Sequence, residues 1–344
     1  LSALSLLVSG THVLASAPRL RRSAPLAPLA PPAQARIIVN PTAGGGRGAS
    51  AMRELAATAS WLTEHGLVAE LCPTTAPGGA RILAAEAVRA GMRMVIAAGG
   101  DGTINEVVQE LAGHTAALGV LPIGTVNVWA REMNIPLSLT EARKVLIEGL
   151  HRRIDLGRAG SRYFLMFAGI GIDAEAARRV EHRWLKRVGL KLLDYVALGG
   201  FLGLTQRPAR VWVRVEGRRR ATHAVQIVVG NTRLWGGTFA FTPNAFVDDG
   251  WLDVVFVGGH HVIHRVAVIL RALLRLPTRG SGVRYERVRT LCLESETPLG
   301  VEVDGELHGY LPMTFSIMPN ALTVVLPHNA PADLFIRQPI TSTS

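Results

Sequence analysis

Hydrophobic and polar positions follow two different patterns along the chain, and the pattern changes near residue 155. From Arg36, continuous apolar runs such as "RIIVN" and "MRMVIAAGG" alternate with stretches in which apolar residues recur every three or four positions. Short continuous runs are typical of buried strands, and the longer spacing is typical of amphipathic helices. Strands that alternate with helices in this way predict a parallel sheet covered on both faces.

This first part predicts four strands, in "RIIVN", "LVAELCPT", "MRMVIAAGG" and "AALGVLPIG". Helices are expected between them, ending near Gly66 and Gly91, then over "TINEVVQELAG", and finally at about 125–133 and 139–149. Thr103 with Glu106, and Ser138 with Glu141, have the spacing of a capping box, which predicts a helix start at each pair.

After residue 155 short β-rich runs dominate, separated by Gly, Asn, Pro and Asp: "YFLMFAG", "RVWVRVEG", "AVQIVVGN", "LDVVFVGG" and "LTVVLP". They indicate an antiparallel sandwich or barrel-like domain, interrupted by helices near 180–204 and 262–276. We therefore expect an α/β protein with an N-terminal Rossmann-like, parallel-sheet domain at 36–155, a C-terminal antiparallel β-sandwich domain at 156–328, and a tail at 329–344.

The first 35 residues begin with an uncharged apolar stretch and continue into a Pro/Ala-rich segment. A signal peptide is one interpretation, but the basic start is missing and Gly10, Thr11 and His12 interrupt the apolar core. We expect a disordered extension over 1–35, with the fold beginning near Arg36.

The charge of the chain indicates the class of its partner. The chain of 344 residues has a formal net charge of +11, which favours a polyanionic partner such as nucleic acid, an anionic membrane or a phosphorylated substrate. Much of the excess lies at 178–220, where "RRVEHRWLKRVGLKLL" combines basic residues with leucines; "HRVAVILRALLRL" is similar. Both segments fit an anionic bilayer surface, or packing on their own domain. Few aromatics stand where bases could stack, so RNA is disfavoured.

Two cysteines far apart, Cys72 and Cys292, form neither a disulfide framework nor a metal pair, which fits a reducing, cytoplasmic compartment. The histidines His260, His261 and His264 have no acidic or thiol residue clustered with them in sequence, so solvated or lipid-facing histidines are favoured over a metal site.

The candidate chemistry begins at "AAGGDGTINEVV", which leads from a predicted strand into a predicted helix. The N–H groups and positive dipole at the start of this helix would face a ligand in the glycine turn, an arrangement suited to phosphate. Asp101 in the turn would repel phosphate unless a divalent cation or a proton transfer uses its charge. Similar turns, "NPTAGGGRG" and "PIGTVN", follow other strands of the same sheet, so a nucleotide with Mg²⁺ is indicated.

Seven motifs follow one another along the chain: "IIVNPTAGGG", "AAGGDGTINEVV", "LPIGTVNVWARE", "DLGR", "FAGIGIDAE", "DDGWLDV" and "VEVDGE". In this order they resemble the motifs of the diacylglycerol kinase and sphingosine kinase family of lipid kinases, in its bacterial branch. The likeness runs from about Arg36 to Pro327. GGDGT alone is shared with NAD kinases and 6-phosphofructokinases, and the later motifs are more specific. The resemblance implies the two-domain fold of NAD kinases and diacylglycerol kinases, with ATP and Mg²⁺ as cofactors.

By this resemblance, residues from five segments would lie at the nucleotide: Asn40, Gly44, Gly45, Thr75, Gly99, Gly100, Gly102, Thr103, Gly124, Thr125, Asn127 and Arg158. The family's catalytic pair matches Asp304 and Glu306, whose side chains would share one face if the segment were a continuous strand. Asp304 is favoured over Asp101 as the general base, with Asp101 at Mg²⁺. An Asp-Gly hairpin turn is the plainer interpretation of "VDGE".

Two further carboxylates have both a functional and a structural interpretation. Asp173 matches a position near the lipid head group, and would otherwise be the N-cap of the next helix. Asp249 matches a structural Mg²⁺ site of some bacterial members, and would otherwise belong to a β-turn.

The resemblance implies a lipid kinase that phosphorylates a hydroxyl, with diacylglycerol the leading acceptor at an anionic membrane surface and no nucleic-acid partner. Phosphatidylglycerol, monoacylglycerol, ceramide and sphingoid bases stay open as acceptors. An NAD kinase and a non-catalytic binder of anionic lipid are the alternatives. We expect a cytoplasmic, peripherally membrane-associated protein; the sequence leaves the oligomeric state open, a homodimer included.

Overall fold

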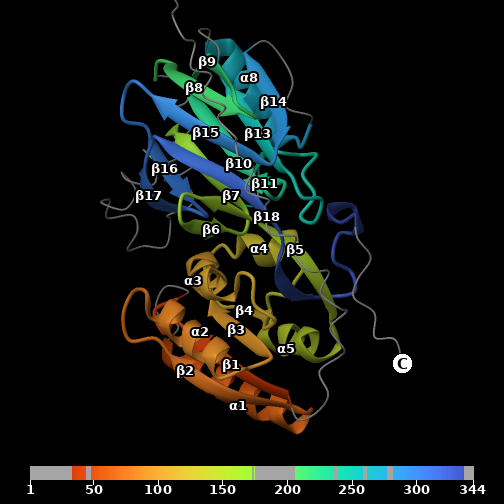
Figure 1. The fold of residues 1–344 in the computed structure, drawn as a ribbon. Coiled ribbons are helices and arrows are strands. Elements are labelled where there is room, and N and C mark those ends of the chain that lie inside the picture. Colours follow the sequence, from red (N-terminus) through yellow and green to blue (C-terminus); the bar gives the residue numbers. More distant parts are fainter. Residues whose placement is uncertain are drawn as a thin grey trace, which may run out of the picture.

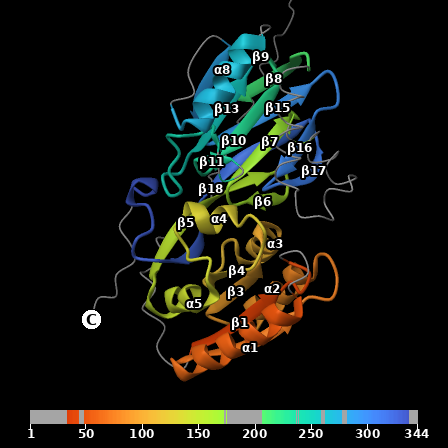
Figure 2. The ribbon, with the colours of Figure 1, turned by 180° about the vertical axis from the view of Figure 1, so that it is seen from behind.

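A computed structural model describes residues 33–43, 48–172, 174, 206–235, 237, 239–258, 262–276 and 282–336 (Figure 1). The predicted helix near 180–204 lies outside these residues, and so do Gly44, Gly45, Asp173, His260 and His261. The described chain forms an α/β part and a β-rich part, which the views from the front and from behind both show one above the other (Figures 1 and 2).

The N-terminal part contains the predicted parallel sheet. Its strands lie in the order β2 (Leu67–Pro73), β1 (Ala33–Val39), β3 (Met94–Gly99) and β4 (Ala117–Pro122). Strand β1 begins three residues before the start predicted near Arg36, since Ala33 and Ala35 are buried and pair with Leu67 and Ala69 of β2. Small apolar side chains can fill the sheet interior as the larger ones do, although they give a weaker signal in the sequence.

Helices cover both faces of this sheet, as the continuous apolar strands require. Neighbouring residues of β3 point to opposite faces: Val95 packs with the cluster beneath α2 (Gly79–Arg89) and α3 (Asp101–Leu111), and Ile96 packs with that beneath α1 (Gly48–Glu64) and α5 (Leu139–Glu148). A two-residue period along the strand therefore supplies both cores.

The C-terminal part is built from two sheets packed face to face. One contains β5 (Leu150–Ala159), β6 (Arg162–Phe164), β8 (Ala209–Val215), β9 (Arg218–Ala224), β15 (Thr290–Ser295) and β18 (Met313–Leu326). The other has the order β14 (Val283–Val288), β13 (Leu252–Val257), β10 (Gln226–Gly230), β7 (Phe167–Gly171), β16 (Gly300–Val303), β17 (Glu306–Tyr310). Side chains of both sheets share one buried cluster, as expected for the predicted sandwich.

Strand β18 connects the two parts. Its first half pairs with β15, and its second half pairs in parallel with β4 through Thr323 and Val324. Strand β5 pairs with β18 along both halves, so the predicted boundary at 155/156 falls inside a strand. The N-terminal sheet therefore continues into the C-terminal sheet, which fixes the edge that carries the glycine turns against the β-rich part.

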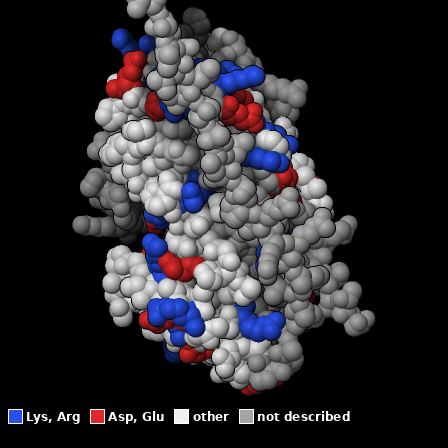
Figure 3. Space-filling view, viewed as in Figure 1, with Lys and Arg blue, Asp and Glu red and all other residues white. Residues whose placement is uncertain are grey.

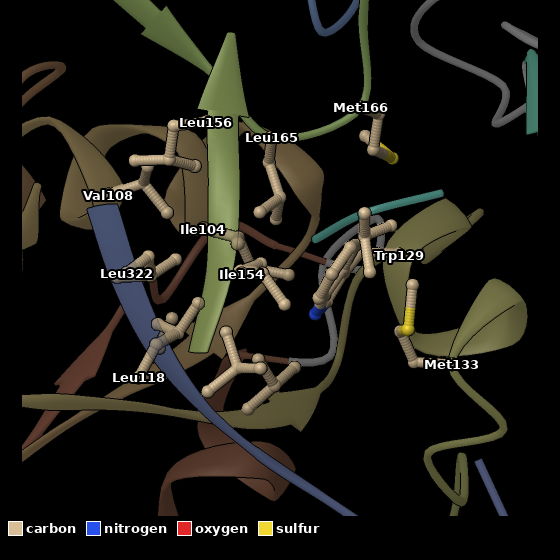
Figure 4. Close-up of a cluster of buried hydrophobic side chains, with 14 of the residues drawn as sticks. Ile104, Val108, Leu118, Trp129, Met133, Ile154, Leu156, Leu165, Met166 and Leu322 are labelled. Atoms are coloured by element: carbon tan, nitrogen blue, oxygen red, sulfur yellow. The ribbon is translucent and has the colours of Figure 1, made fainter. Parts of the chain in front are cut away.

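A buried apolar cluster fills the junction (Figure 4). Trp129 of the short helix α4 (Val128–Glu132) is 1 % exposed and lies among side chains of α3, β4, β5, β18 and the 165–166 segment. Because a large buried side chain contributes several kcal/mol, on the order of 3–5 for its removal, this cluster holds the two parts in one arrangement.

A small hairpin and two further helices lie outside the two large sheets. A small hairpin pairs β11 (Leu234–Trp235) with β12 (Phe239–Ala240), and α8 (Val262–Leu273) confirms the helix predicted near 262–276. The beginning of the predicted tail is packed: Leu334 of the short helix η2 (Ala332–Leu334) and Phe335 have buried side chains, and the Val247 amide donates to the Leu334 carbonyl. Within the described ranges, no helix is both long enough and apolar enough to span a membrane.

Candidate active site

Two glycine turns meet at the carboxyl edge of the parallel sheet. Gly100, after β3, and Gly124, after β4, are so close that a Cβ added to Gly124 would lie 2.4 Å from the Cα of Gly100. The amides of Ile123 and Gly124 both donate to the Gly99 carbonyl, each over 3.2 Å. Only residues without side chains permit this approach of two backbones. The turns form one continuous backbone surface in front of the first turn of α3.

Asp101 connects the same two turns through its side chain. Its Oδ2 accepts a hydrogen bond from the Val128 amide (3.0 Å) and its Oδ1 accepts one from the Trp129 amide (3.1 Å). The carboxylate thus satisfies two N–H groups at the start of α4, where a negative charge is also favoured by the helix dipole. Burial raises its pKa, and the two amides act in the opposite direction. Asp101 therefore has a structural role whether or not it also binds a cation.

The predicted capping boxes are not formed. Helix α3 begins at Asp101 with Gly100 as its N-cap and no side-chain capping bond. Glu106 instead accepts hydrogen bonds from the amides of Gly78 (3.2 Å) and Ala80 (3.0 Å), at the start of α2. Ser138 is the N-cap of α5, as predicted, but its side chain makes no capping bond. A carboxylate from a neighbouring helix has taken the place of the local cap at α2.

The "VDGE" segment is a hairpin turn between β16 and β17, so the prediction that its two carboxylates share one strand face is wrong. Asp304 and Gly305 both have positive φ, +47° and +88°, as the two central residues of a type I′ turn do. Asp304 is 7 % exposed and points into the protein, whereas the Glu306 side chain is 47 % exposed. The turn separates the two side chains by direction and by environment.

Asp304 is surrounded by hydrogen-bond donors. Its Oδ1 accepts from the amides of Met166 (3.0 Å) and Phe167 (3.1 Å), and its Oδ2 accepts from the Leu165 amide (2.8 Å) and from Asn105 Nδ2 (2.7 Å). Two oxygens with two lone pairs each have four accepting positions, and all four are used. Burial raises the pKa of Asp304 to about 6, against the lowering effect of these donors.

Arg162 lies between Asn105 and Glu306. Its Nε and Nη2 donate to Asn105 Oδ1 (3.2 and 2.8 Å), and its Nη2 also donates to Glu306 Oε2 (2.6 Å). The other oxygen of Glu306 lies against the glycine turn, 3.0 Å from where a Cβ on Gly102 would be. Hydrogen bonds thus run from Asp304 through Asn105 and Arg162 to Glu306, and place a solvent-accessible carboxylate at the first turn of α3.

Asn105 and Arg162 are the two site residues that the sequence did not indicate. Asn105 is four positions after Asp101 and therefore lies near it on α3, a spacing that could have singled it out. Arg162 had no local signal, because it reaches the site only through the β5–β6 hairpin. Gln109 holds that hairpin on α3, since it exchanges hydrogen bonds with the backbone N–H and C=O of Tyr163 (2.9 and 2.8 Å).

The remaining predicted nucleotide residues lie around the same edge. Asn40 follows β1, and its Oδ1 accepts from the amide and hydroxyl of Thr42. Thr75 and Thr125 are exposed after β2 and β4. Asn127 has a left-handed φ of +52° and a buried Oδ1 with no hydrogen-bond partner among the described residues. Asn40, Thr75, Thr125 and Asn127 therefore all follow strands whose carboxyl ends converge.

Two other residues that were predicted to lie at the nucleotide, Thr103 and Arg158, have different surroundings in the structure. The Thr103 side chain is buried and packs over Gly99, where an added Cβ would lie 2.3 Å from its Oγ1. Arg158 is exposed on β5, where it pairs in register with Tyr163. The arginine that contacts site residues in the structure is Arg162, four positions later.

Asp249 lies away from this edge, in the turn before β13. Its Oδ1 accepts from the Trp251 amide (2.9 Å), and its Oδ2 forms an ion pair with Arg287. Burial raises the pKa of Asp249, while the Trp251 amide and Arg287 lower it. Among the residues that the structure describes, no three His, Cys, Asp or Glu side chains gather in a way that could hold a metal ion. A cation at Asp249 stays a prediction, and it would compete with Arg287.

Fold and site together define a two-domain protein in which glycine turns line one edge of an α/β sheet and a β-sandwich supplies a carboxylate beside them. The diacylglycerol kinase catalytic domain family matches residues 34–159, and the YegS C-terminal NAD kinase beta sandwich-like domain matches residues 167–326. Diacylglycerol kinases of Staphylococcus aureus strains bovine RF122 / ET3-1 and MRSA252 are each 31% identical over 300 residues, covering 86% of this chain and 93% of theirs. The chain belongs to the diacylglycerol kinase family, whose kinases use ATP.

A solved structure has the same fold. The crystal structure of a diacylglycerol kinase from Bacillus anthracis str. Sterne has a TM-score of 0.66 and 22% sequence identity, covering 86% of this chain and 98% of that one. At this identity the likeness concerns the fold alone. It agrees with the predicted combination of a mostly parallel α/β sheet and an antiparallel β domain.

Proposed function

We propose that the protein is an ATP- and Mg²⁺-dependent lipid kinase that transfers the γ-phosphoryl group to a hydroxyl of diacylglycerol. The observation that carries the proposal is the position of Glu306, a solvent-accessible carboxylate of the β-sandwich domain held beside Gly102 in the glycine turn of the α/β domain. Phosphoryl transfer depends mainly on positioning and charge stabilisation, and this arrangement brings an acceptor for a hydroxyl proton next to a phosphate-binding turn.

The residues present fit a bound ATP. The turns at Gly100 and Gly124 place backbone, and not side chains, next to the first turn of α3, where the N–H groups of a helix start can donate to an anion. The buried Oδ1 of Asn127 has no partner in the part of the chain that the structure describes, and it could accept a hydrogen bond from a ligand donor. Asn40, Thr75 and Thr125 complete the edge, and Arg158 stays a predicted phosphate contact.

The site also fits Mg²⁺, which usually binds one or two carboxylates together with phosphate oxygens and waters, and therefore needs no three-residue cluster. When bound, the ion neutralises phosphate charge. Asp101 would hold it, because each of its oxygens has one accepting position left beside the Val128 and Trp129 amides. Arg162, which is 22% exposed in its side chain, adds a fixed positive charge beside the same turn.

The hydrogen bonds favour Glu306 over Asp304 as the general base. A substrate hydroxyl would have to displace a backbone donor in order to reach Asp304, since all four accepting positions there are used. Glu306 needs no such displacement, because Oε1 faces the glycine turn while Oε2 is held by Arg162. Asp304 then acts as a positioning residue, which fixes the 165–167 segment and Asn105.

Diacylglycerol is the proposed acceptor because the curated relatives at 31% identity are named diacylglycerol kinases. A cavity beside β7, β16 and β17 supports a lipid acceptor, since Pro298, Leu299, Leu307 and Tyr310 line it together with Gly171, Ala174, Gln206 and Gly300. Its β17 wall begins next to Glu306. Asp173, near the head group by resemblance, stays a prediction.

The test is phosphorylation by the full chain of a lipid panel and of NAD, with γ-labelled ATP and Mg²⁺, for the parent and for Glu306→Gln. Label in diacylglycerol that the substitution abolishes supports the proposal. Label in another lipid keeps the lipid kinase and changes the acceptor, and label only in NAD shows an NAD kinase. Absence of label from a folded, ATP-binding parent favours a non-catalytic lipid-binding protein.

A further inference from the structure

Helix α8 has one face committed to the protein core. Val268 and Ala272 are buried, with 4 % and 0 % exposed surface, and pack against the outer side of the sheet that contains β13 and β10. Arg265 is also buried, and its Nη1 donates to the Gln206 carbonyl over 2.6 Å. The helix is thereby fixed at the end of the sandwich that lies farthest from the parallel sheet (Figures 1 and 2).

The opposite face of α8 is apolar and open to solvent. Six of the twelve large hydrophobic side chains exposed in the described chain lie within residues 263–276: Ile263, Val266, Leu270, Leu273, Leu274 and Leu276. Ile263, Leu270 and Leu274 are 73 %, 51 % and 66 % exposed. Ile263, Val266, Leu270 and Leu274 follow one another at spacings of three and four, which places them along one side of the helix. A contiguous stripe of this kind marks an interaction surface, unlike single exposed hydrophobics.

Charge identifies what this surface can contact. Arg271 and Arg275 lie within the stripe's own length, and residues 254–285 contain no Asp or Glu. A second copy of the chain bound face to face would bring these two arginines against their counterparts, and α8 itself carries no acid. An anionic bilayer supplies both an apolar interior for the leucines and negative head groups for the arginines.

We propose that the outward face of α8 docks on the surface of an anionic lipid bilayer. The apolar stripe enters the boundary between head groups and acyl chains, and the arginines remain at head-group level. On the side of the molecule shown in Figure 3, basic and acidic side chains are interspersed. Elsewhere in the β-rich part, Arg214 and Arg219 both pair with Glu294.

Strand directions relate this surface to the candidate active site. Gly171 pairs with Gln226 and Phe167 with Gly230, so β7 runs from the Asp304 region toward the end that carries α8. Strand β17 rises in the same direction from Glu306 to Tyr310, which pairs with Gly300. The cavity between these strands is lined by Gln206, the residue that Arg265 of α8 contacts. Docking through α8 therefore brings the cavity toward the lipid, a consequence that rests on the proposed function.

The docking itself is tested without reference to activity. The full chain is floated with vesicles of equimolar phosphatidylcholine and phosphatidylglycerol, and with vesicles of phosphatidylcholine alone. We expect wild type to float with the anionic vesicles, and the double variant Leu270→Glu/Leu274→Glu to lose about tenfold or more in partitioning. The matched control is Ile82→Glu/Leu137→Glu, which alters side chains 62 % and 44 % exposed on the N-terminal part and should float as wild type does.

Several results would overturn the docking. Wild type that stays in solution with anionic vesicles, a double variant that floats unchanged, or a control that loses as much each contradict a bilayer contact through α8. Light scattering adds a fourth: if Leu270→Glu/Leu274→Glu turns a dimer into a monomer and vesicle binding is unaltered, the surface is an interface between copies.

Phosphoryl transfer separates this inference from the proposed function. With a short-chain diacylglycerol dissolved as monomers, the double variant should turn over as wild type does, whereas with vesicle-embedded diacylglycerol it should lose activity in proportion to its loss of binding. If neither protein phosphorylates the dissolved lipid but only wild type floats, the docking stands and the proposed function fails. Equal activity of both on vesicles overturns the docking while the kinase stands.

Discussion

The Nη2 of Arg162 donates a hydrogen bond to Oε2 of Glu306 over 2.6 Å, between residues 144 positions apart in the chain. The contact joins the β5–β6 hairpin to the Asp-Gly hairpin beside the first turn of α3. Glu306 can therefore face the glycine turn in a fixed orientation although its side chain is 47 % exposed.

Replacing Glu306 by Gln should lower kcat by about 10²–10⁴-fold with little change in thermal stability, because the variant loses a proton acceptor at an exposed position. Steady-state kinetics with diacylglycerol and a thermal melt measure the two effects.

Asp304→Asn is the comparison that distinguishes the two carboxylates as general base. Its amide would direct N–H groups at backbone donors, so the free energy of unfolding should fall by roughly 1–3 kcal/mol. A stable, inactive Asp304→Asn beside an active Glu306→Gln would make Asp304 the base.

Replacing Arg162 by Lys should reduce kcat by roughly tenfold or more, because a single ammonium cannot reproduce the guanidinium's contacts with both Asn105 and Glu306. Arg81→Lys is the control, as Arg81 is 62 % exposed in a surface pair with Glu110. An unchanged rate in Arg162→Lys would show that Glu306 does not depend on this contact.

Asp101→Asn should reduce the free energy of unfolding by about 1–2 kcal/mol, because Asp101 caps α4 through two amides and Asn can accept only one of those bonds without opposing N–H groups. Urea denaturation without nucleotide or metal measures this effect. A residue that serves only to bind a cation would leave the unfolding of the ligand-free protein unchanged, and that result would remove the structural role.

Gly124→Ala should weaken ATP binding and lower stability by about 1–3 kcal/mol, since its Cβ would lie 2.4 Å from the Gly100 Cα and neither backbone can move without shifting a turn. Gly100→Ala, whose Cβ would be 3.3 Å from the Gly124 Cα, should be milder. Calorimetric ATP titration and thermal melts of both variants give the ranking. The reverse order would mean that the two turns are not held together as the structure has them.

The sequence predicted those features of the site that depend on neighbours along the chain. The strand, glycine turn and helix around Gly99 and Gly100 follow from local periodicity and turn chemistry, and the family motifs identified both domains. The Asp-Gly turn at 304–305 was also foreseeable as a hairpin from its two residues alone. Local signals sufficed because the physical cause in each case is a backbone conformation.

The other features depend on residues that meet only after folding. Asp101 caps a helix that begins 27 residues later, and Glu106 caps one that begins 27 residues earlier, so nothing local distinguishes these carboxylates from ligand-binding ones. Strand β18 was predicted only over its apolar end, because its first half alternates buried and exposed residues in the C-terminal sheet. Arg162 was missed for the same reason: its partners are 57 and 144 positions away.

A final prediction concerns Glu132, a buried carboxylate at the end of α4 that no step of the proposed reaction uses. It is 4 % exposed, and Oε1 accepts hydrogen bonds from the amides of Arg233 (2.8 Å) and Leu234 (3.1 Å). Burial raises its pKa from 4.5 to about 7 despite these donors. Between about pH 4.5 and 7, Glu132 is therefore protonated in the folded protein and ionised in the unfolded chain.

Because the folded pKa is the higher one, this contribution to stability is fully present below pH 4.5 and is lost as the pH rises through about 7. Glu132→Gln retains the acceptor for both amides and cannot ionise. Relative to wild type it should gain stability on raising the pH from 5 to 8, by up to about 3 kcal/mol. Urea denaturation at several pH values measures the difference, with the exposed Glu148→Gln as control. A difference between wild type and Glu132→Gln that stays constant with pH would show that Glu132 ionises in the folded protein as it does in the unfolded chain.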